Sequence, residues 1–127
     1  METKISYLSD LKFNLETWIR ELRFHFNEME TFKTKLEEIA SREYTSEVFK
    51  PLEMFENRIA LEKDAISKLI HRCKQKMHNL EIADMTEAID GRLLYEQRPL
   101  RDDIKTYLKL HYELKEEMMD YFLKWLN

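Results

Sequence analysis

Four polar side chains interrupt the apolar ladders of this sequence at positions that otherwise carry hydrophobic residues. They are His25, Glu62, Lys76 and His111. An imidazole can exchange a proton near neutral pH or bind a transition metal, and a carboxylate can accept a proton or bind a cation. A buried carboxylate is unfavourable unless it is paired, so each of these groups needs a partner inside the fold. They are therefore the candidates for a polar site in the core.

His25 and Glu62 are predicted to form a buried hydrogen-bonded pair. If the chain reverses direction near residues 43 and 44, the two residues lie equally far from the turn and share one level of an antiparallel hairpin. An imidazole N–H that faces the carboxylate lowers the cost of burying it. We expect such a pair to fix the register of the helices, as a buried polar residue does in a coiled coil.

His111 and Lys76 are predicted to be polar residues of the core with structural roles. The long stem of Lys76 can lie along the core while its ammonium group reaches water. His111 can find a partner in a tyrosine hydroxyl or near Lys76, but the link before the last helix leaves its register open. The alternative interpretation is a pocket around His25, Glu62 and His111 that binds a ligand or a metal, or that catalyses a reaction.

The histidines do not follow the ligand patterns of familiar helical-bundle metal centres. Ferritin-like di-iron sites place a Glu three residues before a His on two helices, and no histidine here has a Glu at that spacing. Hemerythrin-type centres use His-x-x-x-Glu and His-x-x-x-His pairs, and neither occurs. His71 and His78 share an outward helix face and are expected in solvent. The sequence therefore predicts no metal ligands and no cofactor.

Other kinds of chemistry find little support in the composition. A phosphate-binding loop needs several glycines, and the chain has 1. Cys73 falls on an apolar ladder, where a thiol packs as a small hydrophobic group instead of acting as a nucleophile. The basic stretch 71–78 lacks a motif that reads bases, and the formal net charge is −4. We therefore expect no catalytic residue, no nucleic-acid partner and no membrane partner.

Three long helices must position the polar residues. Apolar residues recur at alternating spacings of three and four over 3–40, over about 46–83, and again after Pro99. This pattern is typical of amphipathic helices that pack lengthwise, as in a coiled coil. Residues 84–98 contain the single Gly and are expected to form a short helix or an irregular link, with Pro99 at the start of the last helix.

The predicted fold is an all-α antiparallel bundle in a single domain, 1–127. Short connections make helices that follow each other in the chain antiparallel, and Thr45 or Ser46 is expected to cap the second helix. Pro51 follows closely, near the start of that helix, where a missing N–H is tolerated. The single cysteine and the absence of an apolar leader from the opening residues predict a cytoplasmic protein.

Surplus apolar residues lie outside the main ladders. Phe13 and Phe24 share one face of the first helix, and Met54 and Leu61 share one face of the second. Exposed apolar residues that merge into a patch form a site for another helix or subunit. The leading functional prediction is therefore a structural or protein-interaction bundle, which associates with itself or with a protein partner.

Three stretches with heptad-like patterns touch all three predicted helices. They are Trp18-Ile19-Arg20-Glu21-Leu22 with His25-Phe26, Phe55-Glu56-Asn57-Arg58 through His71, and Tyr121-Phe122-Leu123-Lys124-Trp125-Leu126. In these stretches the sequence resembles a family of small, uncharacterised, all-helical bacterial proteins. The resemblance implies an all-helical fold, and it brings no known activity and no catalytic residue.

Overall fold

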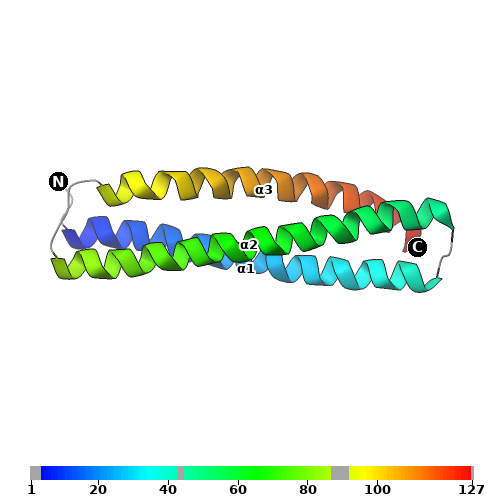
Figure 1. Ribbon diagram of the computed structural model, residues 1–127, viewed down its shortest axis with the longest axis horizontal. Helices are drawn as coiled ribbons and strands as arrows, with labels where there is room; N and C mark the ends of the chain where they lie inside the picture. The colour runs from blue at the N-terminus through cyan, green and yellow to red at the C-terminus, as the bar shows by residue number, and fades with distance from the viewer. Residues whose placement is uncertain (1–3, 43–44, 87–91, 127) are drawn as a thin grey trace.

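Three long helices make up almost all of the described chain. The computed structural model describes residues 4–42, 45–86 and 92–126. Helix α1 is Lys4–Arg42, α2 is Ser46–Thr86 and α3 is Arg92–Trp125. The helices lie lengthwise in an elongated bundle, and each runs antiparallel to the helix that precedes it in the chain (Figure 1). The predicted all-α bundle of three long helices is confirmed, and none of the described helices is both long and apolar enough to cross a bilayer.

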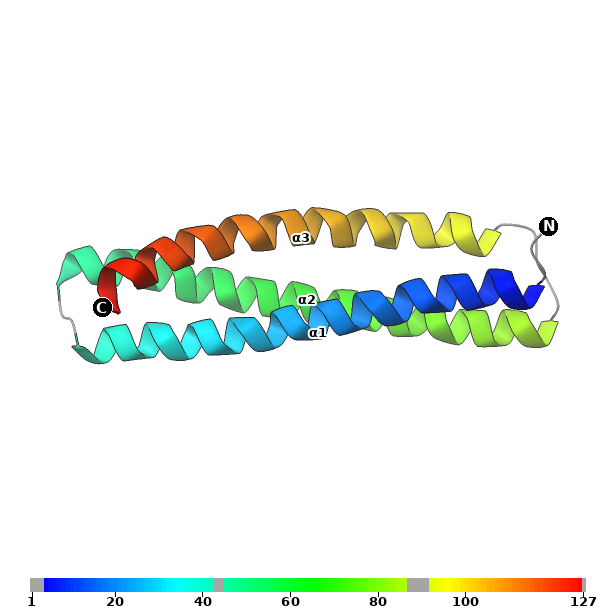
Figure 2. The same ribbon diagram turned by 180° about the vertical axis from the view of Figure 1, so that it is seen from behind.

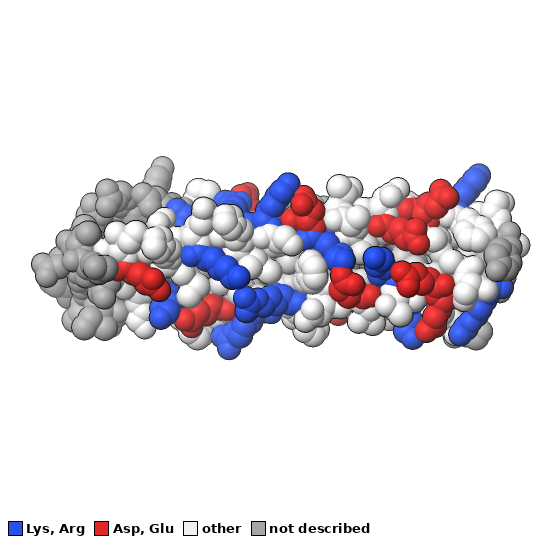
Figure 3. Space-filling view, turned by 60° about the horizontal axis from the view of Figure 1, so that its bottom comes forward, with Lys and Arg blue, Asp and Glu red and all other residues white. Residues whose placement is uncertain are grey.

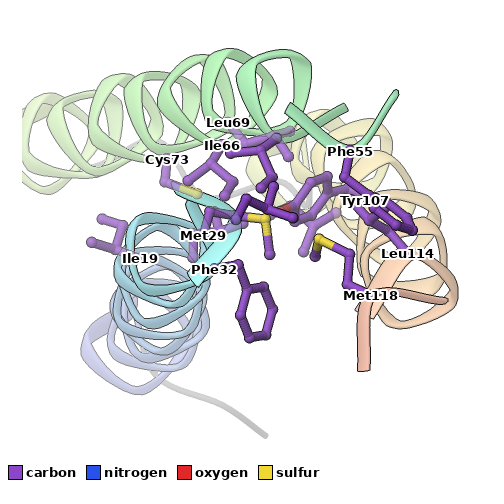
Figure 4. Close-up of a cluster of buried hydrophobic side chains, with 14 of the residues drawn as sticks. Ile19, Met29, Phe32, Phe55, Ile66, Leu69, Cys73, Tyr107, Leu114 and Met118 are labelled. Atoms are coloured by element: carbon purple, nitrogen blue, oxygen red, sulfur yellow. The ribbon is translucent and has the colours of Figure 1, made fainter. Parts of the chain in front are cut away.

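An apolar stripe on each helix holds the bundle together. The buried positions follow the predicted ladders, and side chains from all three helices meet in the centre (Figure 4). Leu22 on α1, Ile66 on α2 and Leu114 on α3 are almost completely covered. Burying a side chain of this size contributes about 1.5–3 kcal/mol. The spacing of these residues therefore explains both why the helices form and which faces they bury.

α1 and α2 form the closer pair, and α3 packs on them at a larger backbone separation (Figure 2). Aromatic side chains fill much of the wider space. The ring of Phe122 lies 5.6 Å from that of Phe32, and the ring of Tyr121 lies 5.2 Å from that of Phe55. The Tyr121 hydroxyl also donates to the carbonyl oxygen of Val48 at 2.9 Å. Large side chains thus set the distance of α3 from its neighbours.

Helix α2 begins where the sequence predicts. The carbonyl oxygen of Thr45 accepts hydrogen bonds from the backbone N–H groups of Val48 at 3.1 Å and Phe49 at 3.2 Å. Thr45 therefore occupies the N-cap position, because its carbonyl accepts the first bonds of the helix while the residue itself precedes it. Pro51 lies inside α2, close to this end.

The predicted start of the last helix at Pro99 is wrong. α3 already begins at Arg92, so Pro99 lies inside the helix, and α2 continues to Thr86. A proline removes one backbone hydrogen bond, but the helical face on either side still gains burial, because Gln97 and Leu100 are both buried. The link is therefore no longer than residues 87–91, which lie outside the described residues.

Candidate functional site

A buried polar network crosses the middle of the bundle and joins all three helices. Its centre is His111 on α3, which is 0% exposed. Nδ1 of His111 lies 3.0 Å from Oε2 of Glu62 on α2, and Nε2 lies 3.1 Å from Oε1 of Glu28 on α1. A carboxylate only accepts hydrogen bonds, so His111 satisfies both neighbours when both ring nitrogens carry hydrogen.

Two further side chains from α3 support the carboxylates. The Tyr107 hydroxyl donates to Oε2 of Glu62 at 3.2 Å, and burial, together with the charge of Glu62, raises the pKa of Tyr107. Nζ of Lys115 donates to Oε2 of Glu28 at 2.8 Å. Burial alone would raise the pKa of Glu28, but the hydrogen bonds from Lys115 and His111 outweigh it and hold that pKa below its usual value. Tyr107 therefore stays a donor and Glu28 stays an anion at neutral pH.

His25 is the residue of this region that lacks a hydrogen bond. It is 2% exposed, and neither ring nitrogen has a hydrogen-bond partner among the described residues. Nδ1 lies 3.9 Å from Oε1 of Glu28, Nε2 lies 3.8 Å from Oε1 of Glu21, and the ring centroid lies 4.1 Å from that of His111. Burial and the neighbouring His111 lower the pKa of His25. Its ring is therefore neutral at neutral pH, with a lone pair available inside the core.

The predicted His25–Glu62 hydrogen bond is wrong, although both residues belong to the same region of the bundle. His111 contacts both of them, and it takes the position beside Glu62 that was predicted for His25. The physical reason is that the prediction considered only the hairpin of the first two helices. Side chains of α3 reach into the same layer and compete for Glu62. The predicted tyrosine neighbour of His111 is Tyr107, whose hydroxyl lies 3.5 Å from Nδ1.

Glu28 is the member of the network that the sequence analysis missed. It lies beside the apolar ladder, next to Met29, and such a position usually faces water. A usable signal was its place three residues after His25, which puts both side chains on one helix face. Lys76, the fourth polar candidate, is half-buried on α2, and its predicted stem along the core stays a prediction.

The four predicted interaction residues, Phe13, Phe24, Met54 and Leu61, are all exposed, but they occupy different surroundings. Phe13, which is 60% exposed, borders a groove between α1 and α2. The ring of Phe24 instead lies 5.6 Å from the ring of His25. Only Phe13 of this set therefore adjoins the hollow described next.

The groove between α1 and α2 combines an apolar lining with a basic rim, and we call it the α1–α2 groove. It measures about 660 Å³, and Figure 4 shows Ile19 on the side of α1 turned away from α3. A second hollow of about 380 Å³ adjoins it and shares Arg23 and Lys74. The α1–α2 groove is lined by the apolar residues Phe13, Ile19 and Met77, the basic residues Arg20, Arg23 and Lys74, and the acidic residue Glu16.

The basic rim carries three cations against one lining carboxylate, that of Glu16. Arg23 and Lys74 form no ion pair or hydrogen bond with any residue that the structure describes. Arg20 has a hydrogen bond of 3.5 Å to the Thr17 hydroxyl, which is neutral. Figure 3 views the side formed by α1 and α2, where basic side chains gather over the middle and acidic ones toward the right-hand end.

Comparison with known proteins gives no match to a family model, a curated protein or a solved structure. The resemblance to small bacterial helical proteins therefore stays a prediction. Conclusions about function depend on the two features described above, the buried network and the α1–α2 groove.

Proposed function

We propose that this protein is a cytoplasmic docking module whose α1–α2 groove binds an acidic, amphipathic helical segment of a partner protein. The observation that carries the proposal is that Arg23 and Lys74, beside an apolar lining, have no ion-pair partner among the described residues. Some other cations of this chain do pair across helices, as Arg72 does with Asp103 at 2.6 Å. An unpaired basic rim on a chain of net charge −4 supports an interaction with a negatively charged partner.

The shape and lining of the groove favour a helix over a small molecule. The groove is open instead of enclosed, and a helix can lay its apolar face into such a depression between two helices. Each exposed ion pair contributes only about 0.2–1 kcal/mol. The apolar contacts with Phe13 and Met77, which are not fully buried, therefore supply most of the affinity, and the charges select the partner.

A second copy of this chain is the competing occupant. Acidic side chains gather toward one end of the face that carries the groove (Figure 3). Two molecules laid antiparallel would bring the acidic end of one near the basic rim of the other. We favour a separate partner because that acidic end already carries ion pairs of its own, including Lys124 with Glu47 at 3.0 Å.

The proposal is tested with a labelled helical peptide that carries Leu at the i, i+3, i+4 and i+7 positions and Glu elsewhere. Fluorescence anisotropy should show saturable binding that weakens as salt is added. Replacing Arg23 and Lys74 with Glu removes two exposed ion pairs and should weaken binding about tenfold. The matched control replaces Lys105 and Lys109, which are exposed on α3, with Glu and should leave the affinity unchanged.

Two results would overturn this function. The first is equal binding of the peptide to the groove variant and to the α3 control, or equal binding of a peptide with Lys in place of Glu. The second comes from sedimentation equilibrium of the protein alone. A dimer that dissociates when Arg23 and Lys74 are replaced would identify a second copy as the occupant.

A further inference from the structure

We propose that His25, Glu28 and His111 bind a divalent transition-metal ion at the centre of the bundle, with Glu62 orienting His111. The potential ligand atoms of these three residues lie within 4.8 Å of one another, and two helices contribute them. Two imidazole nitrogens and one carboxylate oxygen form a donor set that suits Zn²⁺ or Fe²⁺ and leaves further coordination positions open. The site is distinct from the α1–α2 groove and does not depend on the docking function.

The state of His25 is the first argument for an ion. Its side chain is 98% covered, and both ring nitrogens lack a hydrogen-bond partner among the described residues. Buried polar atoms are rarely left in this state, because the lost hydration is not replaced. Nδ1 already faces Oε1 of Glu28 at 3.9 Å, so an ion between them would supply the missing partner.

The contact between Glu62 and His111 is the second argument. Histidines that bind metals commonly donate the N–H of their other nitrogen to a carboxylate, which fixes the tautomer and the orientation of the ring. Here Nδ1 of His111 faces Glu62 at 3.0 Å, and the Tyr107 hydroxyl donates to the same oxygen of Glu62 at 3.2 Å. Nε2 of His111 is thereby directed toward Glu28 and the neighbouring His25.

The distances require only small movements to accommodate an ion. Tetrahedral ligand atoms about 2.0 Å from zinc are about 3.3 Å from one another. Oε1 of Glu28 lies 3.1 Å from Nε2 of His111 and 3.9 Å from Nδ1 of His25, which brackets that spacing. On binding, the ion takes the lone pair of Nε2 in place of its proton, which passes to solvent. Lys115 occupies the other oxygen of Glu28, and as a partly exposed side chain it can turn toward water.

His71 and His78 form the natural control. They lie on the exposed face of α2 and line a shallow hollow with Lys74, Gln75 and Asn79. Exposed histidines one heptad apart can hold a metal ion weakly without any built site. Replacing both with Ala therefore tests adventitious surface binding without touching the core.

The test titrates chelator-treated protein with Zn²⁺ by calorimetry and with Co²⁺ by visible absorption. We expect one ion per chain, with the His25→Leu and His111→Leu variants at least about 100-fold weaker and the His71→Ala/His78→Ala variant unchanged. The Arg23→Glu/Lys74→Glu variant should also bind the ion normally, so the metal site and the docking groove can fail separately. Circular dichroism confirms that each variant is folded.

A measurement on the unaltered protein covers the case in which a core variant does not fold. Imidazole ¹H–¹⁵N spectra should show the signals of His25 and His111 shifting together in slow exchange as Zn²⁺ is added. The proposal is overturned if no ion binds at stoichiometric concentration, if only the His71 and His78 signals shift, or if replacing those two residues abolishes binding.

Discussion

Oε2 of Glu62 lies 3.0 Å from Nδ1 of His111, and this contact joins α2 to α3 inside the core. Each residue stands on an apolar ladder, where it would be unfavourable alone. Together they satisfy each other, and Tyr107 adds a second donor to the same carboxylate oxygen. The contact therefore places His111 at the level of Glu62, a register of α3 that the sequence pattern leaves open.

Replacing Glu62 with Leu should lower the free energy of unfolding by roughly 1–3 kcal/mol, because His111 and Tyr107 both lose an acceptor. The double replacement of Glu62 and His111 with Leu should recover much of that loss. Urea denaturation of the wild type, both single variants and the double variant measures the coupling energy. A second double-mutant cycle, between Glu62 and His25, gives the comparison. A larger coupling energy for Glu62 with His25 than with His111 would contradict the observed network.

Replacing His25 with Leu should stabilise the metal-free protein by about 1 kcal/mol. The change removes two buried nitrogens without hydrogen bonds and keeps a side chain of similar size in the core. Urea denaturation in the presence of a chelator is the measurement. Residues of functional sites often lower the stability of the folded protein, and His25 would be such a residue. Clear destabilisation would mean that His25 has a stabilising partner after all.

The thiol of Cys73 should make stability depend on pH in the alkaline range. Burial raises the pKa of Cys73 from 9.0 to about 11. Between these values the unfolded chain loses the thiol proton while the folded chain keeps it, so the free energy of unfolding falls as the pH rises. The free energies of unfolding of the wild type and of the Cys73→Val variant, measured at pH 8 and at pH 10.5, isolate this contribution. Equal pH dependence in the two proteins would show that the thiol is not shielded.

Replacing Pro99 with Ala should stabilise the protein by roughly 1–3 kcal/mol. Alanine restores the backbone N–H that a helix interior uses and removes the clash of the proline ring with the preceding turn. Thermal and urea unfolding both report the change, and Lys105→Ala serves as a control for helix propensity alone. If Pro99 were the true start of the helix, the replacement would give little or no gain.

The long helices and most of their buried faces could be predicted from the sequence, because burial in a bundle follows the helical period directly. Leu22, Ile66 and Leu114 stand on the predicted ladders and are almost completely covered. The start of α3 could not be predicted from Pro99, because the local penalty of a proline competes with burial gained over many residues. Tertiary packing decided that boundary.

The site was predictable only in part. The turn between the first two helices brings His25 and Glu62 to the same region of the bundle, but the choice of partner depends on the rotation and register of α3. That register follows from packing around Tyr107 and His111, which no spacing along the chain encodes. Glu28 was not predicted as a site residue because a position beside the apolar ladder is solvent-exposed in most helices. Here α3 covers it, and Lys115 of α3 donates a hydrogen bond to it.

The most direct test of the account is a nuclear Overhauser spectrum of the metal-free protein with assigned histidine rings. The rings of His25 on α1 and His111 on α3 face each other, with their centroids 4.1 Å apart. This contact puts the polar side chains of the two helices at the same level of the bundle. We predict a strong cross-peak between the ring protons of these two histidines. Its absence, with both rings assigned and the helices intact, would contradict the network and the metal site built on it.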